Sequence, residues 1–381
     1  MRVAAVVPHW NRRDLLFPLF ESIRAQTLPF DEIIVADNGS TDDSAELAER
    51  AGARVLRLGR NLGFAAAVNR GIEATRADWI ATLNNDVTLE ANWLATLLAA
   101  AERDGAWFAT GKILRAEDAT ILDGTFDAIS RGACACRCGA GKTDSPEWNK
   151  TCSIRFAPMT AALFRRTLFD EVGLLDEAFE SHLEDVDFGL RCALAGREGI
   201  YVPAAVAHHC GSATLGAWNS DTVRRIARNQ VLLAEKHFRG QPTWPIVAGQ
   251  LLWGLLALRH ARGMAFLRGK VSGLRLGRAI RNKHRVLQAE KERLRCIIDA
   301  SEREILELER QTGFDWYWRA YFWLSPRSYR TSRSALTDYA TGMVLGLPLC
   351  GRCASENGTT ARKNQFRQSW LSLGFTQTVS N

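Results

Sequence analysis

In the first part of the chain, residues 1 to about 104, short apolar runs alternate with stretches that have the spacing of amphipathic helices. The apolar runs predict strands at residues 3–7, 33–36, 54–58 and 79–83. Residues 13–25 predict a helix with one apolar face, formed by Leu15, Leu16, Leu19, Phe20 and Ile23. This alternation is typical of an α/β fold with an open, mainly parallel, twisted sheet flanked by helices.

Polar residues follow the first, second and fourth predicted strands. Pro8 and Asn11 come after the first, Asp37 ends the second, and Asn84-Asn85-Asp86 follow the fourth. Parallel strands joined by right-handed crossovers place ligands at their carboxyl ends, so we expect these three loops to line one cleft. Asp37 would accept hydrogen bonds from a nucleobase or ribose, although residues 37–43 are equally suited to a turn and a helix cap.

The same loops exclude two common classes of nucleotide-binding protein. No glycine-rich turn follows the first predicted strand, and no phosphate-binding loop ending in Gly-Lys-Ser/Thr occurs in the chain. The sequence therefore indicates neither a dinucleotide-dependent dehydrogenase nor a P-loop enzyme. The carboxylate of Asp86 would suit Mg²⁺ or Mn²⁺, which share oxygen ligands with substrate phosphates, with a polar turn as the alternative interpretation.

A second acidic group lies far along the chain, where Leu183-Glu-Asp-Val-Asp-Phe-Gly-Leu-Arg191 predicts the start of a helix. A carboxylate held there can remove a proton from a hydroxyl group. The alternative is a solvated acidic helix start, which the helix dipole favours.

Several motifs together resemble one enzyme family. They are Pro8-His-Trp-Asn-Arg, Asp37-Asn-Gly-Ser-Thr-Asp, Asn61-Leu-Gly-Phe-Ala with Asn69-Arg-Gly, Asn84-Asn-Asp, and Glu184-Asp-Val-Asp-Phe-Gly-Leu-Arg. In this order the chain is similar to the inverting glycosyltransferases of family two, and most to bacterial rhamnosyltransferase-like members, over residues 3 to about 238. The resemblance implies a GT-A fold, a nucleoside-diphosphate sugar donor and a divalent metal, Mg²⁺ or Mn²⁺. Beyond residue 238 the resemblance is weak, and the sequence pattern itself predicts a C-terminal helical extension.

The resemblance also implies roles for individual residues. Asp185 matches the catalytic base, with Glu184 and Asp187 as secondary candidates, and Asp86 matches a metal ligand. The expected contacts with the nucleotide sugar are Pro8, Asn11, Asp37, Asn38, Asn61, Gly63, Asn69, Asn85 and Asp86. The family motif usually begins with an acid where this chain has Asn84, so one acidic metal ligand is missing. The family's histidine after a proline-ended strand matches His209, with His208 as the alternative because the two are adjacent; either could instead serve packing.

These roles predict an inverting transfer of one sugar, with rhamnose as the expected sugar, to a hydroxyl of a glycan or lipid-linked acceptor in bacterial cell-surface polysaccharide synthesis. Residues 112–162 are irregular and are expected to form loops on the acceptor side. A catalytically inactive sugar-nucleotide-binding protein of the same fold is an alternative. A processive polysaccharide synthase is another, but several membrane spans and a Gln-X-X-Arg-Trp signature are missing.

The basic excess of the chain, whose formal net charge is +7, is concentrated at residues 259–289. This stretch follows an uncharged run at residues 240–258, of which the apolar part, residues 246–258, is too short to span a bilayer. The combination predicts an interfacial region that docks on anionic lipid, with a buried helix beside a solvated basic face as the alternative. Nucleic acid is not an expected partner. The N-terminus lacks the zones of a signal peptide, so we expect a cytoplasmic protein, peripheral on the inner face of the cell membrane.

The remaining patterns concern organisation. Residues 284–311 predict a long exposed helix or a helical hairpin that would suit a homodimer. The aromatic residues at 316–323 would lie at a bilayer surface or cap the preceding helix. The expected domains are a glycosyltransferase domain at 1–238, divided into a nucleotide-binding half (1–104) and an acceptor and catalytic half (105–238), a helical basic region at 239–330 and a poorly ordered tail at 331–381. Reduced thiols are expected, and structural zinc is an alternative for Cys134, Cys136, Cys138 and Cys152, or for Cys350 and Cys353.

Overall fold

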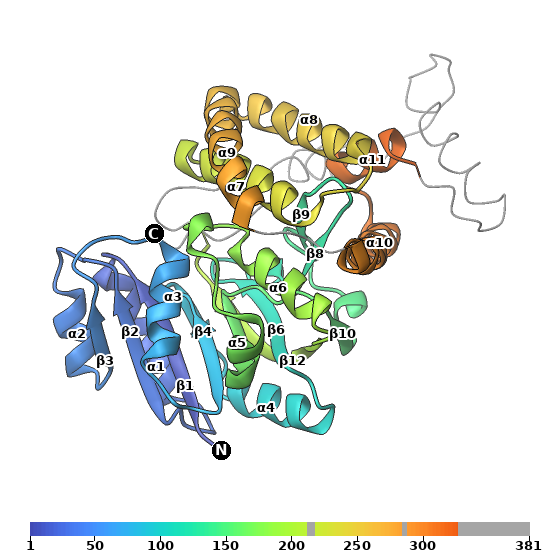
Figure 1. Ribbon diagram of the computed structural model, residues 1–381. Coiled ribbons are helices and arrows are strands. Elements are labelled where there is room, and N and C mark those ends of the chain that lie inside the picture. The colour runs from blue at the N-terminus through green and yellow to red at the C-terminus, as the bar shows by residue number, and fades with distance from the viewer. Residues whose placement is uncertain (212–217, 284–287, 327–381) are drawn as a thin grey trace, which may run out of the picture.

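A twisted sheet lies at the centre of the protein. The computed structural model describes residues 1–211, 218–283 and 288–326, and within them the first four strands are β1 (Val3–His9), β2 (Glu32–Asp37), β3 (Arg54–Arg57) and β4 (Trp79–Leu83). They pair in parallel in the order β4-β1-β2-β3. The predicted strands are thus confirmed, with shifts of a residue or two at their ends. Every residue of β1 is buried, because helices cover both faces of the sheet (Figure 1).

The helices of this half are α1 (Arg13–Arg24), α2 (Ser44–Arg50), α3 (Phe64–Glu73) and α4 (Trp93–Arg103). The predicted apolar face of α1 is buried at Leu16, Leu19, Phe20 and Ile23. On the other face of the sheet, α3 packs closely on β1, since a side chain at Gly71 would lie only 2.3 Å from Val6. The resulting layers are those of an open α/β sheet.

The second half of the sheet is mixed rather than parallel. Its strands are β5 (Val87–Leu89), β6 (Phe108–Arg115), β7 (Leu122–Gly124), β10 (Cys152–Ile154), β11 (Ala161–Arg165) and β12 (Gly199–His209). Strand β11 is antiparallel to both β4 and β6, and β12 is parallel to β6. Residues 112–162 are therefore more ordered than expected: β6 continues to Arg115, and a separate hairpin forms from β8 (Asp127–Ile129) and β9 (Ala135–Arg137).

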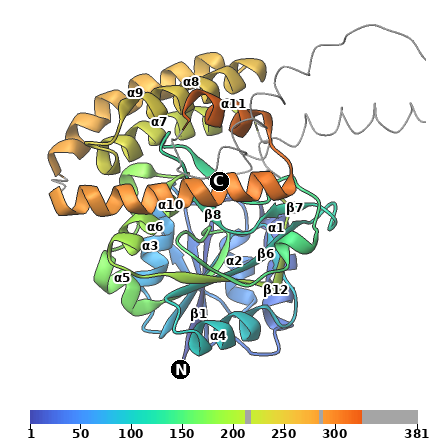
Figure 2. The same ribbon diagram turned by 90° about the vertical axis from the view of Figure 1, so that its right-hand side faces the viewer.

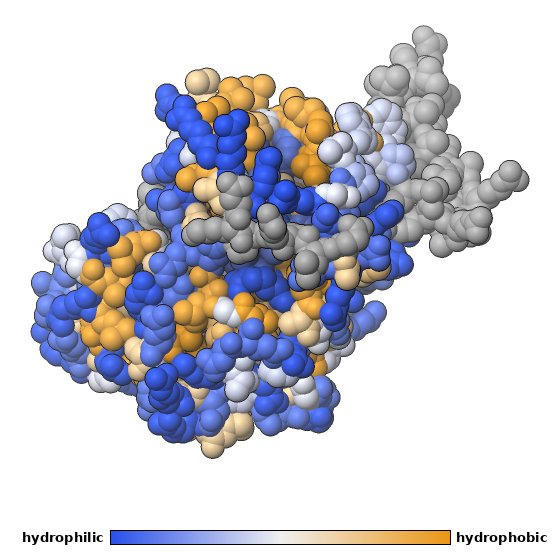
Figure 3. Space-filling model, in the orientation of Figure 1, coloured by the Kyte–Doolittle hydropathy of each residue, from blue (hydrophilic) through white to orange (hydrophobic). Residues whose placement is uncertain are grey.

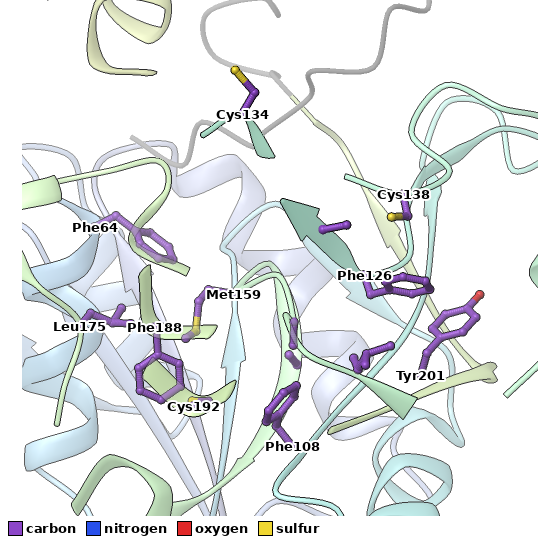
Figure 4. Close-up of a cluster of buried hydrophobic side chains, with 14 of the residues drawn as sticks. Phe64, Phe108, Phe126, Cys134, Cys138, Met159, Leu175, Phe188, Cys192 and Tyr201 are labelled. Carbon is purple, nitrogen blue, oxygen red and sulfur yellow. The ribbon is translucent and has the colours of Figure 1, made fainter. Parts of the chain in front are cut away.

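An apolar core holds the two helices that follow β11. This core includes α5 (Arg166–Val172) and α6 (Glu184–Leu194). The rings of Phe169 and Phe188 stack with centroids 5.0 Å apart, and Phe164 meets Phe188 edge-on. Gly189 lets α6 lie against Phe156, because a side chain there would come within 2.4 Å of the ring. Figure 4 shows Phe188 and Phe64 in one continuous cluster, so the start of α6 is held beside the sheet.

Helices after β12 form a layer over the carboxyl ends of the parallel strands (Figures 1 and 2). They are α7 (Ser220–His237), α8 (Thr243–Arg259), α9 (Gly263–Lys283), α10 (Gln288–Thr312) and α11 (Trp316–Leu324). Glycines bring α9 close to α7: a side chain at Gly269 would lie 2.3 Å from the Arg224 carbonyl oxygen, and one at Gly273 would lie 2.7 Å from that of Arg228. The expected helical extension is thus a cover for one edge of the sheet.

The helix expected at residues 284–311 is present in the described part as α10, and its polar face is exposed, but its apolar face packs within this chain. Its apolar residues Leu294, Ile298, Ile305 and Leu306 are buried within this chain, and Ser301 Oγ accepts a hydrogen bond from the backbone N–H of Ile129. The apolar spacing that suggested a homodimer is therefore used for packing within the chain. Of the aromatic residues in α11, Tyr317 and Tyr321 are buried, and the Tyr317 hydroxyl donates to the Gly249 carbonyl of α8.

Two other expectations concern the membrane and the tail. None of the helices in the described residues has both the length and the apolar character that a bilayer crossing needs. The tail at 331–381, with Cys350 and Cys353, lies outside the described residues.

Candidate active site

The loops after β1, β2 and β4 meet at one edge of the sheet, as the sequence predicts. His9 and Asp37 are partners in the register of β1 and β2, and Asn85 Nδ2 lies 2.9 Å from His9 Nδ1. A pocket opens at this edge, lined by Pro8, His9, Asn38, Asn61, Gly63, Phe64 and Arg225. Four of the expected donor contacts, Pro8, Asn38, Asn61 and Gly63, are among these residues.

The polar side chains around this pocket also hold its walls. Asp37 Oδ1 accepts a hydrogen bond from the Ser40 backbone N–H, and Asn38 bridges to the next loop by accepting from Leu62 N–H and donating to the Gly63 carbonyl. Asn11 Oδ1 accepts from Thr41 N–H at 2.9 Å. The turn interpretation of residues 37–43 is therefore correct, and it leaves the buried Asp37 carboxylate at the strand end.

Asn69 is placed differently from the expected donor contacts. Its side chain donates to the Leu175 carbonyl at 2.9 Å and accepts from the Leu175 N–H at 3.0 Å. These bonds tie α3 to the turn before α6, and Asn69 does not line the pocket. The helical pattern of α3 gave no indication of which polar side chain faces the ligand and which faces the protein.

Strand β12 separates the two adjacent histidines. Successive side chains of a strand point to opposite faces, and His209 Nε2 lies 3.1 Å from Asp86 Oδ1, whereas His208 lies 3.3 Å from Glu90. The Nδ1 atom of His209 is 3.0 Å from Asp123 Oδ2. Burial alone would lower the pKa of His209, but the carboxylates of Asp86 and Asp123 raise it to about 10. The structure thus brings together His209 and Asp86, and not His208.

The residues around Asp86 fit a divalent cation that also binds phosphate oxygens. Asp86 Oδ1 and His209 Nε2 have only each other as close partners, at 3.1 Å, and the buried Asn84 Oδ1 makes no hydrogen bond within the described residues. A carboxylate and an imidazole are suitable ligands for Mn²⁺ or Mg²⁺ when substrate phosphates complete the shell. Within residues 1–211, 218–283 and 288–326, no cluster of three or more His, Cys, Asp or Glu is placed to hold an ion. Cys134 and Cys138, considered above as zinc ligands, are buried members of the apolar core.

Asp185 lies in the first turn of α6, which follows a strained turn. Glu180, His182 and Leu183 all have positive φ angles, of 59°, 72° and 67°, which non-glycine residues adopt at a cost. The turn is held from α7, where the Asn229 side-chain amide donates to the carbonyls of Phe179, Ser181 and His182 at 2.7–2.8 Å. A buried amide with several backbone partners fixes the turn, and therefore fixes the position of the Asp185 carboxylate.

Buried charges surround Asp185. Arg137 of β9 lies 3.1 Å from Asp127 and 3.8 Å from Asp185 Oδ2, and it passes Gly124, where a side chain would lie within 2.3 Å of the arginine chain. Burial and the neighbouring Asp127 raise the pKa of Asp185 to about 7, although Arg137 opposes this shift. A carboxylate with this pKa can accept a proton near neutral pH.

The two neighbouring acids differ from Asp185. Burial and the nearby Asp185 raise the pKa of Glu184 well above its usual value. Asp187 is fully buried and lies within 2.7–3.1 Å of Arg191, Lys236 and His237. Burial would raise the pKa of Asp187, but these cations hold it far below its usual value. Asp187 is therefore part of the link between α6 and α7, rather than a group free to orient an acceptor.

Four residues of this site were not found by sequence reasoning: His9, Asp123, Arg137 and Arg225. His9 belongs to the motif Pro8-His-Trp-Asn-Arg but was given no role, and burial lowers its pKa to about 4. Asp123 and Arg137 belong to the segment that was expected to form loops, and Arg225 lies in a stretch for which no element was predicted. Their positions follow from strand pairing and helix packing, which leave no local pattern.

Comparisons with known proteins show the family and the fold. Residues 4–173 match the model of glycosyl transferase family 2. The chain is 30% identical over 252 residues to an N-acetylglucosaminyl-diphospho-decaprenol L-rhamnosyltransferase of Mycobacterium tuberculosis (strain ATCC 25618 / H37Rv), covering 60% of this chain and 81% of that protein. It is 30% identical over 127 residues to the putative teichuronic acid biosynthesis glycosyltransferase TuaG of Bacillus subtilis (strain 168), covering 32% of this chain and 50% of that protein.

Among solved structures, the fold is similar to that of GalNAc-T7, crystallised with UDP, GalNAc and Mn²⁺. The TM-score is 0.57 at 15% identity, and the match covers 82% of this chain and 58% of that one. At this identity the likeness concerns the fold alone. Together with the sequence matches, it shows that this chain belongs to glycosyl transferase family 2 and has the GT-A fold.

Proposed function

We propose that this protein is an inverting glycosyltransferase that moves one sugar from a nucleoside diphosphate to a hydroxyl of a lipid-linked or glycan acceptor. The observation that supports it most is that one fold holds three elements of such a reaction: Asp185, a carboxylate whose pKa is raised to about 7, a polar pocket at the strand ends, and the Asp86–His209 pair. The first of these groups suits proton removal, and the pair suits a phosphate-bound cation.

The connections within the site support a single reaction centre. Asp86 contacts His209, which contacts Asp123 of β7. Two strands later along the chain, Arg137 of β9 lies between the carboxylates of Asp127 and Asp185 and contacts both. On the other side of the pair, Asn85 contacts His9, the register partner of Asp37. A donor bound across this edge would have its base near Asp37 and its diphosphate near Asp86.

The proposed step is a single in-line displacement. Asp185 takes the proton from the acceptor hydroxyl while its oxygen forms a bond to the anomeric carbon of the sugar. The bond from that carbon to the diphosphate oxygen breaks, and its electron pair leaves with the nucleoside diphosphate. A divalent cation held by Asp86 and His209 would neutralise the charge of the diphosphate. Attack from the face opposite the leaving group inverts the anomeric configuration.

The acceptor proposal draws on the relatives. The mycobacterial protein named above is an L-rhamnosyltransferase acting on a decaprenol-linked sugar by its name, and TuaG is named for teichuronic acid biosynthesis. By analogy we propose a rhamnose donor and a polyprenol-linked acceptor in cell-surface polysaccharide synthesis. An acceptor with a polyprenyl chain remains in the bilayer, so its enzyme has to work at the membrane surface.

Helices α8 and α9 offer such a surface. An outward apolar row, with side chains between 44% and 64% exposed, is formed by Trp244, Val247, Leu251, Leu255 and Leu258 of α8 and Met264, Leu267, Val271 and Leu274 of α9. Figure 3 shows apolar side chains gathered over these two helices. The exposed residues Arg268, Arg275 and Arg278 of α9 lie beside this row. An apolar row bordered by arginines is complementary to an anionic bilayer, so we propose a peripheral position on the cytoplasmic face of the cell membrane.

The function is tested with the full-length protein and a panel of nucleoside-diphosphate sugars, including dTDP-rhamnose, with Mn²⁺ and a polyprenyl-diphosphate-linked N-acetylglucosamine. We expect one donor to release its nucleoside diphosphate only when acceptor is present, and to give a glycoside of opposite anomeric configuration by NMR. Binding of nucleotides without release from any donor would favour the inactive binding protein instead, and retention of configuration would contradict the single displacement.

A further inference from the structure

Helix α7 carries an arginine that lacks the partners of its neighbours. Arg224 pairs with Asp221 at 3.3 Å, and Arg228 binds Glu180 and the Phe179 carbonyl. For Arg225, the Nε atom is buried and makes no hydrogen bond within the described residues. A buried guanidinium N–H without an acceptor is costly, so a partner that accepts a hydrogen bond from Arg225 is expected, and an anion would suit its charge.

The side chain of Arg225 faces the donor pocket. It lines the pocket together with Pro8 and His9 of β1 and with Asn38, Asn61, Gly63 and Phe64, and it is the only cation among these lining residues apart from any charge on His9. Burial lowers the pKa of His9 to about 4, which leaves His9 neutral at neutral pH. The permanent positive charge of this pocket therefore comes from the helical layer and not from the sheet.

Arg225 lines the pocket and its charge also acts on His182 of the turn before Asp185. The pocket wall touches this turn, since the Ala65 N–H donates to the Glu180 carbonyl at 2.9 Å and a side chain at Gly63 would lie 3.0 Å from the same oxygen. Glu180 is held by Arg228, one turn of α7 after Arg225. His182 of the same turn lies close enough to Arg225 for that charge to act on it. Burial and then the charge of Arg225 lower the pKa of His182 to about 3.

We propose that Arg225 binds the diphosphate of the sugar-nucleotide donor and of the departing nucleoside diphosphate. This inference rests on the proposed function and adds a cation to it from outside the sheet. In a bound donor, the diphosphate would connect the nucleobase in the pocket to the sugar beside Asp185, and Arg225, as a residue of the pocket wall, would meet it there. A guanidinium can bind two phosphate oxygens at once. This chain has Asn84 where a second acidic metal ligand could stand, so the metal would be held less strongly. Arg225 would then supply part of the positive charge that neutralises the diphosphate.

The test measures binding rather than turnover. Isothermal titration calorimetry with the full-length protein and Mn²⁺ compares dTDP, UDP and GDP, and then the best of these with its own nucleoside. The variants are Arg225→Met, which keeps most of the aliphatic chain, and Arg225→Ala, with Arg224→Ala as a matched control from the same helix. Thermal unfolding of each variant confirms that it is folded.

For both Arg225 variants we expect nucleoside diphosphate binding to weaken about tenfold or more, as for loss of a charge-assisted hydrogen bond. Nucleoside binding should stay within about twofold, and Arg224→Ala should behave like the wild type because exposed ion pairs contribute little. Wild-type affinity for the diphosphate in folded Arg225→Met would overturn this inference and leave the proposed function standing. If the wild type binds none of the three nucleoside diphosphates, both proposals fail.

Discussion

The guanidinium of Arg137 lies 3.8 Å from the Asp185 carboxylate, and both side chains are buried. Asp127 lies on the other side of Arg137, at 3.1 Å. Burial is the main cause of the raised pKa of Asp185, and the hairpin β8–β9, which was not among the predicted elements, adds one like charge (Asp127) and one opposite charge (Arg137) to it.

This arrangement predicts the pH dependence of transfer. Because the pKa of Asp185 is raised to about 7, the proton-accepting form increases as the pH rises, and kcat/KM should rise through about pH 7. Asp127→Asn removes a negative charge that raises the pKa of Asp185, so its rising limb should shift to lower pH. Measured pH profiles of kcat/KM for the wild type and Asp127→Asn would show this shift. The exposed Asp170→Asn is the control, and identical profiles for all three proteins would contradict the prediction.

Asp123 should orient the proposed metal ligand. Its carboxylate lies 3.0 Å from His209 Nδ1, which leaves Nε2 facing Asp86. Partners of this kind commonly contribute about 10–100-fold to metal affinity, so Asp123→Asn should weaken Mn²⁺ binding by a factor in this range. Electron paramagnetic resonance of free Mn²⁺ in the presence of nucleoside diphosphate measures the affinity directly. Asp118→Asn, on an exposed loop, should leave it unchanged; equal affinities in all three proteins would rule out this role.

Asn229 should stabilise both the fold and the base. Its side chain donates to three backbone carbonyls of the turn before Asp185. Asn229→Ala would remove this donor from all three, and only the Phe179 carbonyl would keep a side-chain partner, Arg228. We expect a loss of about 1–3 kcal/mol in the free energy of unfolding, together with a fall in kcat that exceeds any change in nucleotide affinity. Urea unfolding and steady-state kinetics test both effects. The exposed Gln311→Ala serves as the amide control, and an unchanged kcat in folded Asn229→Ala would refute the positioning role.

The apolar row on α8 and α9 should bind lipid. Leu251 and Leu255 are 61% and 54% exposed, and replacing both by serine removes apolar area from the proposed contact. Flotation with vesicles containing anionic lipid should fall about tenfold or more, because each buried leucine contributes roughly 1.5–3 kcal/mol. Phe17→Ser, which changes an equally exposed apolar residue on α1, should float like the wild type. Equal flotation of all proteins would exclude this surface.

The sheet and much of the cleft could be predicted from sequence because their signals are local. Strands β1 and β4 are buried along their whole length, so their apolar runs are continuous, and their polar ends mark the cleft. The pair His208 and His209 shows the limit of such reasoning, since only strand pairing decides which imidazole faces Asp86. Arg137 and Asp123 lie in a segment whose order comes from distant partners.

The helical region shows the same limit in another form. The apolar spacing of α10 predicted a helix correctly, but spacing alone does not distinguish a surface that packs on its own chain from one that packs on another. Arg225 and Arg228 have the same residue type and lie one turn apart on one helix, yet one faces the pocket and the other binds the turn before Asp185. Only the packing of α7 over the sheet separates these two tasks.

The central claim is that Asp185 is the base of a sugar transfer that uses the adjoining pocket. Asp185→Asn keeps the size of the side chain and removes its ability to take a proton, so acceptor-dependent release of nucleoside diphosphate should fall by about 100-fold or more. Nucleoside diphosphate affinity should stay near the wild-type value, because Asp185 is not among the residues that line the pocket. Wild-type turnover in folded Asp185→Asn would contradict the account.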